Sequence, residues 1–200
     1  MTIEKLDTLA EGCRYECLKG IALWYTGLPS SGKTTLAMEA KAFLETLSLP
    51  VVVLDGDVIR PIIASDIDYS PEGRRRSLGR YIQLSKVLIQ SRIIVMVVVN
   101  NHSQEQREIA RRSHPKGQFI EIWVDTPLHI CMQRDVKGLY AQAERGEVTD
   151  LVGVNIKYEP PRNPDIVITT DKKSLSEESE MIFSYLKAAG IITPVLKGKT

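Results

Sequence analysis

A glycine-rich run after the first strongly apolar segment carries the side chains best suited to chemistry. It reads Gly27-Leu-Pro-Ser-Ser-Gly32-Lys33-Thr34-Thr35, a complete G-x-x-x-x-G-K-[ST] pattern between an expected strand and an expected helix. Backbone N–H groups of such a loop surround phosphate oxygens, and the following helix adds a partial positive charge. The lysine reaches the β- and γ-phosphates, and the first threonine hydroxyl ligates Mg²⁺. The predicted nucleotide-binding residues here are Gly27, Ser30, Ser31, Gly32, Lys33, Thr34 and Thr35, with Thr34 as the Mg²⁺ ligand.

A second group of polar residues, Asp55-Gly56-Asp57-Val-Ile-Arg60, ends the next apolar run. Open α/β sheets bind ligands at the carboxyl ends of their strands, next to a phosphate loop. There Asp57 can accept a proton from an attacking hydroxyl, and Arg60, three residues further along a helix, can bind an anionic acceptor. The alternative is an N-cap aspartate with a local ion pair. No Asn-Lys-x-Asp is present, so a GTP switch is not expected, and the D-x-x-G form at 150–153 lies too late in the chain.

Short apolar runs that alternate with stretches of helical period must position these residues. The expected strands are Ile21–Tyr25, Val51–Leu54, Ile93–Val99, Phe119–Val124 and Asp165–Ile168, and the expected helices are Lys33–Leu47, Pro71–Gln90, Ser103–Arg112, Pro127–Arg134 and Ser174–Ala189. This alternation predicts an α/β fold, the three-layer P-loop NTPase fold with a mostly parallel five-stranded sheet. Residues 136–164 contain three glycines and three prolines with little apolar periodicity, which predicts a mobile lid.

Length and composition favour one domain over residues 1–200, with an N-terminal extension at 1–20. Lys plus Arg is 26 and Asp plus Glu is 25, a net charge of +1, so nucleic-acid binding is disfavoured. No apolar run approaches the roughly 20 residues of a membrane helix, so we expect no membrane association and a cytoplasmic location. The three cysteines, Cys13, Cys17 and Cys131, cannot all pair; we expect reduced thiols, with Cys131 in the core.

Three further motifs make the chain recognisable. Asp135-Val-Lys137-Gly-Leu-Tyr140, Tyr158-Glu-Pro-Pro161 and Asn163-Pro-Asp165-Ile-Val-Ile168 follow the two groups above in order. Together they resemble the adenylylsulfate kinases, and the resemblance runs from about Ile21 to Ala189. It implies a phosphotransferase of sulfate assimilation that moves the γ-phosphoryl of ATP to the 3′-hydroxyl of adenylylsulfate, giving 3′-phosphoadenylylsulfate with Mg²⁺ as cofactor. It also implies a homodimer.

The resemblance assigns roles to individual residues. Asp57 is the base, Arg60 and Arg74 bind the acceptor's phosphosulfate, Lys137 on the lid closes over the acceptor, Tyr69 stands for the phenylalanine that stacks on the adenine, and Arg134 approaches the nucleotide phosphates. Of the arginines around Arg74, we expect Arg75 and Arg76 to be mostly solvated, and the role of Arg80 stays open.

The chain departs from the family pattern mainly at the expected acceptor site. Ser77 stands where the family has an asparagine, Asn101 replaces a serine, Leu151 replaces the second aromatic wall around the base, and Asp68 replaces a glycine. Losing one stacking face costs about 1–3 kcal/mol and relaxes the demand for a purine. Another nucleotide-linked acid, such as a cytidine diphosphoramidate of surface-polysaccharide biosynthesis, is therefore the alternative acceptor.

A non-catalytic nucleotide-binding regulator is a third hypothesis. The intact Lys33, Thr34, Asp57 and Arg60 argue against it, because a retired site need not keep both a phosphate clamp and a base. His102 is either a group that contacts the acceptor or a loop histidine without such a duty.

Overall fold

The five apolar runs form one sheet in which every neighbouring pair of strands is parallel. The computed structural model describes residues 14–170 and 173–195. The spatial order is β3 (Val51–Asp55), β4 (Ile94–Val98), β2 (Ile21–Thr26), β5 (Phe119–Val124) and β6 (Ile166–Ile168). All residues of β2 and β4 are buried, as expected for strands covered on both faces. The predicted fold class is confirmed, with strand ends within one residue of the prediction.

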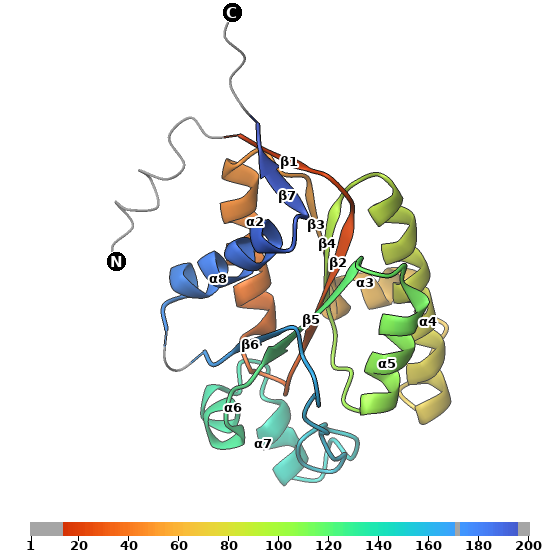
Figure 1. Ribbon diagram of the computed structural model, residues 1–200. Coiled ribbons are helices and arrows are strands. Elements are labelled where there is room, and N and C mark those ends of the chain that lie inside the picture. The colour runs from red at the N-terminus through yellow and green to blue at the C-terminus, as the bar shows by residue number, and fades with distance from the viewer. Residues whose placement is uncertain (1–13, 171–172, 196–200) are drawn as a thin grey trace, which may run out of the picture.

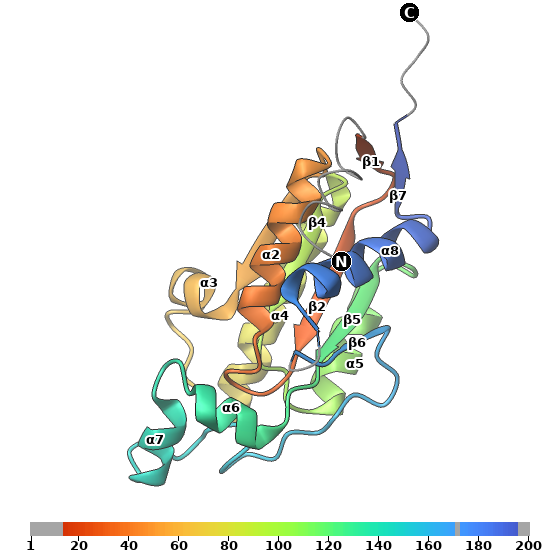
Figure 2. The same cartoon turned by 90° about the vertical axis from the view of Figure 1, so that its left-hand side faces the viewer.

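Helices cover both faces of this sheet (Figures 1 and 2). Helices α2 (Lys33–Thr46) and α8 (Leu175–Ala188) lie on one face, and α3 (Gly56–Ile63), α4 (Pro71–Gln90) and α5 (Gln104–Ser113) lie on the other. Successive residues of β2 serve different cores, since Leu23 packs in the α2–α8 core and Trp24 in the α4 core. The alternating side-chain directions of a strand produce this division, and the result is three layers.

Side-chain caps fix where the helices begin. The Ser70 hydroxyl accepts from Gly73 N, with Pro71 as the first helical residue of α4. Ser103 caps α5 in the same way, and Ser174 forms a capping box with Glu177 at the start of α8. Ser103 and Ser174 are therefore caps, whereas the sequence analysis placed each one inside its helix.

The segment between β5 and β6, which includes the predicted lid, lies at the carboxyl ends of the strands (Figure 1). It contains α6 (Leu128–Arg134) and α7 (Leu139–Glu144). The expectation that residues 136–164 lack regular elements was wrong for α7. The Asp135 carboxylate, three residues before the N-cap Gly138, accepts from the N–H groups of Tyr140 and Ala141 at 3.0 Å each. These bonds satisfy amides of the first turn and stabilise a short helix for which apolar periodicity gives no signal.

The two ends of the described chain meet on the opposite side of the sheet from the lid. Strands β1 (Tyr15–Cys17) and β7 (Ile192–Pro194) pair antiparallel. Strand β1 lies within the predicted N-terminal extension, and neither of these two strands was among the predicted ones. Cys17 and Cys131 are buried free thiols, and Cys13 lies outside the described residues. Within 14–170 and 173–195, no helix is long and apolar enough to cross a membrane.

Candidate active site

The glycine-rich loop turns sharply between β2 and α2, and two glycines make that turn possible. Gly27 has φ +151°, and a Cβ there would lie 2.6 Å from the carbonyl oxygen of Val124. Gly32 has φ +100° and precedes the first residue of α2. Side chains at either position would strain the backbone. The loop therefore lies against the end of β5, with the N-terminus of α2 facing the site.

Lys33 folds back over the loop to which it belongs. Its Nζ donates to Leu28 O at 2.7 Å and to Gly27 O at 3.1 Å, and lies 3.4 Å from Ser31 Oγ. Burial lowers the pKa of Lys33 to about 8, because the desolvated ammonium is disfavoured. An anionic phosphate in the loop would favour the charged form again.

Thr34 and Asp55 bring together the oxygen ligands of a candidate Mg²⁺ site. Thr34 Oγ1 donates to Asp55 Oδ2 at 2.7 Å, and Asp55 is buried at the end of β3. P-loop proteins hold Mg²⁺ with such a hydroxyl and a nearby aspartate, with nucleotide phosphates completing the ligand set. The described residues contain no group of three His, Cys, Asp or Glu side chains that would hold a metal without such phosphates. Asp55 was not among the predicted site residues, although a carboxylate at the end of the strand beside a P-loop is a signal for a metal-binding role.

The other oxygen of Asp55 caps α3. Asp55 Oδ1 accepts from Asp57 N at 2.9 Å. Asp55 is therefore the N-cap of α3, and the alternative that Asp57 is an N-cap aspartate is wrong. The Asp57 carboxylate instead forms an ion pair with Lys137 of the lid segment. Both side chains are more than half exposed, so this contact between site and lid can exchange for a substrate contact.

Arg60 and Tyr69 form the near wall of the expected acceptor site. The guanidinium of Arg60 lies 4.0 Å from the centre of the Tyr69 ring, a cation–π contact. It also donates to Asp68 O at 2.6 Å and to Ile67 O at 3.1 Å, and lies 3.3 Å from Ser77 Oγ. Ser77, predicted to contact substrate, is buried behind Arg60 and supports that arginine.

A cavity of about 630 Å³ lies next to this wall. Tyr69, Arg74, His102 and Asp150 are among its lining residues. Burial and the charge of Arg74 lower the pKa of His102, which favours a neutral imidazole near pH 7. Leu151 is not among the lining residues. It is buried beside Cys131 and Tyr140 in a small apolar cluster.

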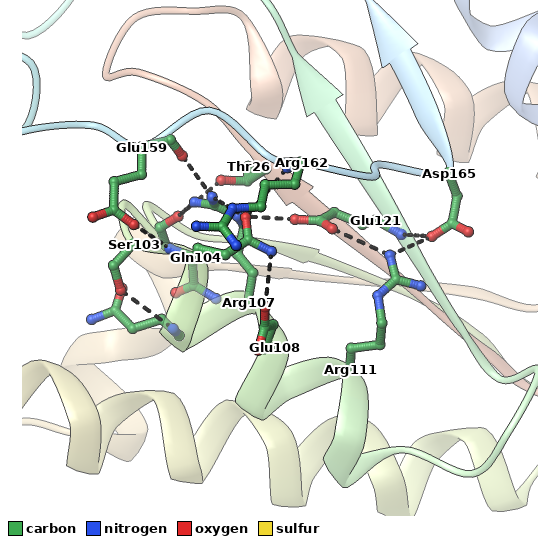
Figure 3. Close-up of polar contacts among 12 residues, drawn as sticks. Thr26, Ser103, Gln104, Arg107, Glu108, Arg111, Glu121, Glu159, Arg162 and Asp165 are labelled. Atoms are coloured by element: carbon green, nitrogen blue, oxygen red, sulfur yellow. Dashed lines mark hydrogen bonds and ion pairs between the residues drawn. The ribbon is translucent and has the colours of Figure 1, made fainter.

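A buried guanidinium near the cavity joins the loop after β4 to the predicted lid segment at Glu159 (Figure 3). Arg107 donates to Asn101 O at 2.7 Å and to Glu159 O at 2.6 Å, and pairs with Glu121 of β5 at 3.0 Å. The side chain of Arg107 is fully buried and that of Glu121 is 4% exposed. Burial raises the pKa of Glu121 and lowers that of Arg107. Asn101 enters the network through its carbonyl oxygen, whereas its enclosed Nδ2 has no partner among the described residues.

Arg134, the last residue of α6, lies on the nucleotide side of the site. Its Nη1 donates to Thr170 Oγ1 at 3.1 Å and to Ser31 O at 3.3 Å. A side chain that contacts the loop carbonyl of Ser31 is within reach of phosphates bound by that loop. Arg80 pairs with Asp66, and Arg76 lies 3.7 Å from the same carboxylate. Arg75 lines the cavity beside Arg74 and lies 3.5 Å from Glu105.

Comparison with known proteins agrees with this geometry. The family model described as adenylylsulphate kinase matches residues 19–169. An adenylyl-sulfate kinase of Halothermothrix orenii is 38% identical over 174 residues, which are 87% of this chain and 93% of the relative. A probable adenylyl-sulfate kinase of Bacillus subtilis is 36% identical over 174 residues, which are 87% of this chain and 87% of the relative.

The chain belongs to the adenylylsulfate kinase family. A solved structure of the Mycobacterium tuberculosis APS kinase in complex with AMPPNP and APS superposes with a TM-score of 0.81 at 34% identity, covering 84% of this chain and 98% of that one.

Family membership alone would not have identified three residues in and around this adenylylsulfate kinase site. Asp55 joins the first turn of α2 to the start of α3, Arg107 joins the loop after β4 to Glu159 in the predicted lid segment, and Asp150 binds Arg74. A strand-end carboxylate signals the first. The other two depend on contacts between distant parts of the chain: Arg107 and Glu159 are 52 residues apart, and Arg74 and Asp150 are 76 residues apart. No local sequence pattern records such contacts.

Proposed function

We propose that this chain transfers the γ-phosphoryl group of ATP to the 3′-hydroxyl of adenylylsulfate and so makes 3′-phosphoadenylylsulfate for sulfate assimilation. The observation that carries the proposal is the position of Asp55. One of its oxygens contacts the Thr34 hydroxyl and the other binds the amide of Asp57. A single side chain therefore holds the expected metal ligand and the expected base at a fixed separation.

The residues divide the work of phosphoryl transfer between them. The loop amides and Lys33 hold the β- and γ-phosphates, and Arg134 approaches the same phosphates from α6. Mg²⁺, when bound at Thr34 and Asp55, supplies positive charge that offsets the charge on the phosphate oxygens. Such preorganised positive groups stabilise a loose transition state whose negative charge is spread over three oxygens.

Asp57 supplies the acid–base step. Its carboxylate accepts the proton of the acceptor hydroxyl as that oxygen attacks the γ-phosphorus and the bond to the leaving ADP breaks. Its exchangeable contact with Lys137 lets the lid respond to the acceptor. Arg60 and Arg74 are proposed to bind the phosphosulfate, and Tyr69 offers a face to the adenine.

The test is ADP release from Mg·ATP with a panel of acceptors. The panel holds adenylylsulfate, a cytidine-linked phosphoramidate, other nucleotide-linked acids and buffer alone. We expect turnover with adenylylsulfate and a product that mass spectrometry and ³¹P NMR show to carry a 3′-phosphate. Turnover only with a different acceptor would replace the substrate in this proposal, and ADP release with none of them would favour a regulator without transfer activity.

We further propose that the protein acts as a homodimer in the cytoplasm, where ATP and nucleotide acceptors are available. Val58 and Ile62 of α3 are 65% and 72% exposed, and such apolar side chains side by side on one helix suit contact with a second copy. Sedimentation velocity of the full chain should give twice the monomer mass, and cell fractionation should place it with soluble enzymes. A monomer over the whole concentration range would reject the dimer.

A further inference from the structure

Arg74, which the proposed function assigns to the acceptor's anionic tail, already has a carboxylate bound to it. Its Nη2 donates to Asp150 Oδ2 at 2.8 Å and to Asp150 O at 3.2 Å, while its Nε donates to Tyr69 O at 2.9 Å. The Arg74 side chain is 16% exposed and that of Asp150 is 48% exposed. The partly buried guanidinium is therefore held from two sides by groups of this chain.

Each arginine that lines the cavity beside Arg74 has a carboxylate of this chain next to it. Its two arginines are Arg74 and Arg75, and its two acidic residues are Asp150 and Glu105. Asp150 pairs with Arg74, and Glu105 lies 3.5 Å from Arg75. An anionic ligand that enters the cavity must therefore compete with a carboxylate for either arginine.

Asp150 also connects this competition to the lid. The next two residues, Leu151 and Val152, are 6% and 3% exposed. Leu151 packs with Cys131 and Tyr140, and Tyr140 donates its hydroxyl to Pro29 O of the phosphate loop at 3.0 Å. The carboxylate thus has limited freedom to move away, because its neighbours are anchored.

We propose that Asp150 is a specificity-determining residue of the acceptor site. Its carboxylate occupies Arg74 in place of the acceptor's anionic tail, and binding exchanges one anion for the other. This inference rests on the proposed function. A strongly anionic acceptor gains enough free energy from Arg74 to offset the loss of the Asp150–Arg74 ion pair, and a weakly anionic one does not. A neutral nucleoside leaves the pair intact. Asp150 thereby imposes a charge threshold on acceptors.

The test measures binding without transfer. The full chain is saturated with Mg·AMPPNP and titrated by calorimetry with adenylylsulfate and, separately, with adenosine. Asp150→Asn should bind adenylylsulfate about two- to fivefold more tightly, the range expected from the loss of a competing ion pair near the surface. Adenosine affinity should not change, and the gain should shrink at about 0.5 M salt, where such pairs are screened.

The control is Glu144→Gln, a matched loss of charge at the exposed end of α7. Glu144 has no side-chain hydrogen bond or ion pair among the described residues. Glu144→Gln should bind adenylylsulfate and adenosine with the affinities of the unaltered chain. In an Arg74→Met background, Asp150→Asn should have no effect, because the arginine over which the two anions compete is gone.

Unchanged or weaker binding of adenylylsulfate by Asp150→Asn would overturn the inference, as would an equal gain for adenosine or for Glu144→Gln. Its failure is distinguishable from that of the proposed function. The predicted gain in binding without ADP release would reject the function and keep the inference. Normal turnover with an unaltered affinity in Asp150→Asn would do the reverse. Absence of adenylylsulfate binding in both proteins would reject both.

Discussion

Lys33 shows how a functional residue is set by its immediate surroundings. Its ammonium donates to two loop carbonyls inside the fold, and burial lowers its pKa to about 8. Nucleotide phosphates reverse that effect, since a nearby negative charge favours the protonated amine. The charge of Lys33 therefore depends on whether the loop holds phosphate.

We predict that ATP binding takes up a proton through Lys33. Near pH 8 the free site is about half protonated, so binding should take up as much as about half a proton, and about none near pH 6.5, where the amine is already charged. The measurement is calorimetry in buffers of different ionisation enthalpy. Lys33→Met should bind ATP weakly and without this uptake. An equal uptake at both pH values would contradict the assignment.

Asp57 is the residue whose role is most directly testable. Asp57→Asn removes the proton acceptor and leaves the loop and its lysine in place, so kcat should fall about 10²- to 10⁴-fold while the Kd for ATP stays unchanged. Steady-state kinetics and calorimetry measure the two effects. Asp66→Asn, an exposed aspartate that pairs with Arg80, controls for loss of charge. Full activity of Asp57→Asn would remove Asp57 from the mechanism.

At the scale of elements, the sequence predicts best what burial alone determines. Continuous apolar runs placed β2 and β4 to within one residue, because strands covered on both faces read as nearly continuous apolar runs. Strand β1 went unrecognised, since its partner β7 lies at the other end of the chain and three-residue strands carry no period. The P-loop was predictable because its spacing is local. The choice of Asp55 over Asp57 as the cap was not, because both aspartates suit an N-cap and only the geometry of the site separates them.

The Arg107–Glu121 pair joins elements, and its loss should affect both stability and acceptor binding. Arg107→Met leaves the buried Glu121 carboxylate with Arg111 as its one cationic ion-pair partner among the described residues, and removal of one member of a buried pair costs about 3–5 kcal/mol. Because Arg107 also holds Asn101 O and Glu159 O, the KM for the acceptor should rise more than the KM for ATP. Urea unfolding and steady-state kinetics measure the two effects.

The double variant Arg107→Met/Glu121→Gln separates charge from packing. It removes the uncompensated carboxylate and should recover part of the free energy of unfolding while the acceptor KM stays high, because the contacts to the two carbonyls are still missing. Arg112→Met is the control, since Arg112 has a side chain that is 80% exposed. Equal changes in both KM values would make Arg107 a residue of general stability and not a positioning residue.

In the whole molecule, the candidate active site and the pairing of β1 with β7 lie at opposite ends of the sheet (Figure 1). The phosphate loop and the lid lie at the carboxyl ends of the strands, whereas β1 and β7 join the two ends of the described chain at the other side. This two-stranded ribbon of β1 and β7 is part of the core, since Ile192 of β7 and the preceding Ile191 are each 2% exposed and pack in the α2–α8 core. Such a separation implies that stability can be altered there without a change at the site.

We predict that Ile192→Ala lowers the free energy of unfolding by about 2–5 kcal/mol, the cost of removing a large buried aliphatic side chain, and leaves the Kd for ATP unchanged. Urea unfolding followed by circular dichroism measures the first quantity and calorimetry the second. Val195→Ala, three residues further along and 46% exposed, should change stability by less than about 0.5 kcal/mol. A weaker ATP affinity in folded Ile192→Ala would show that the ribbon and the phosphate loop are coupled through the sheet, and the separation argued from the fold would then be wrong.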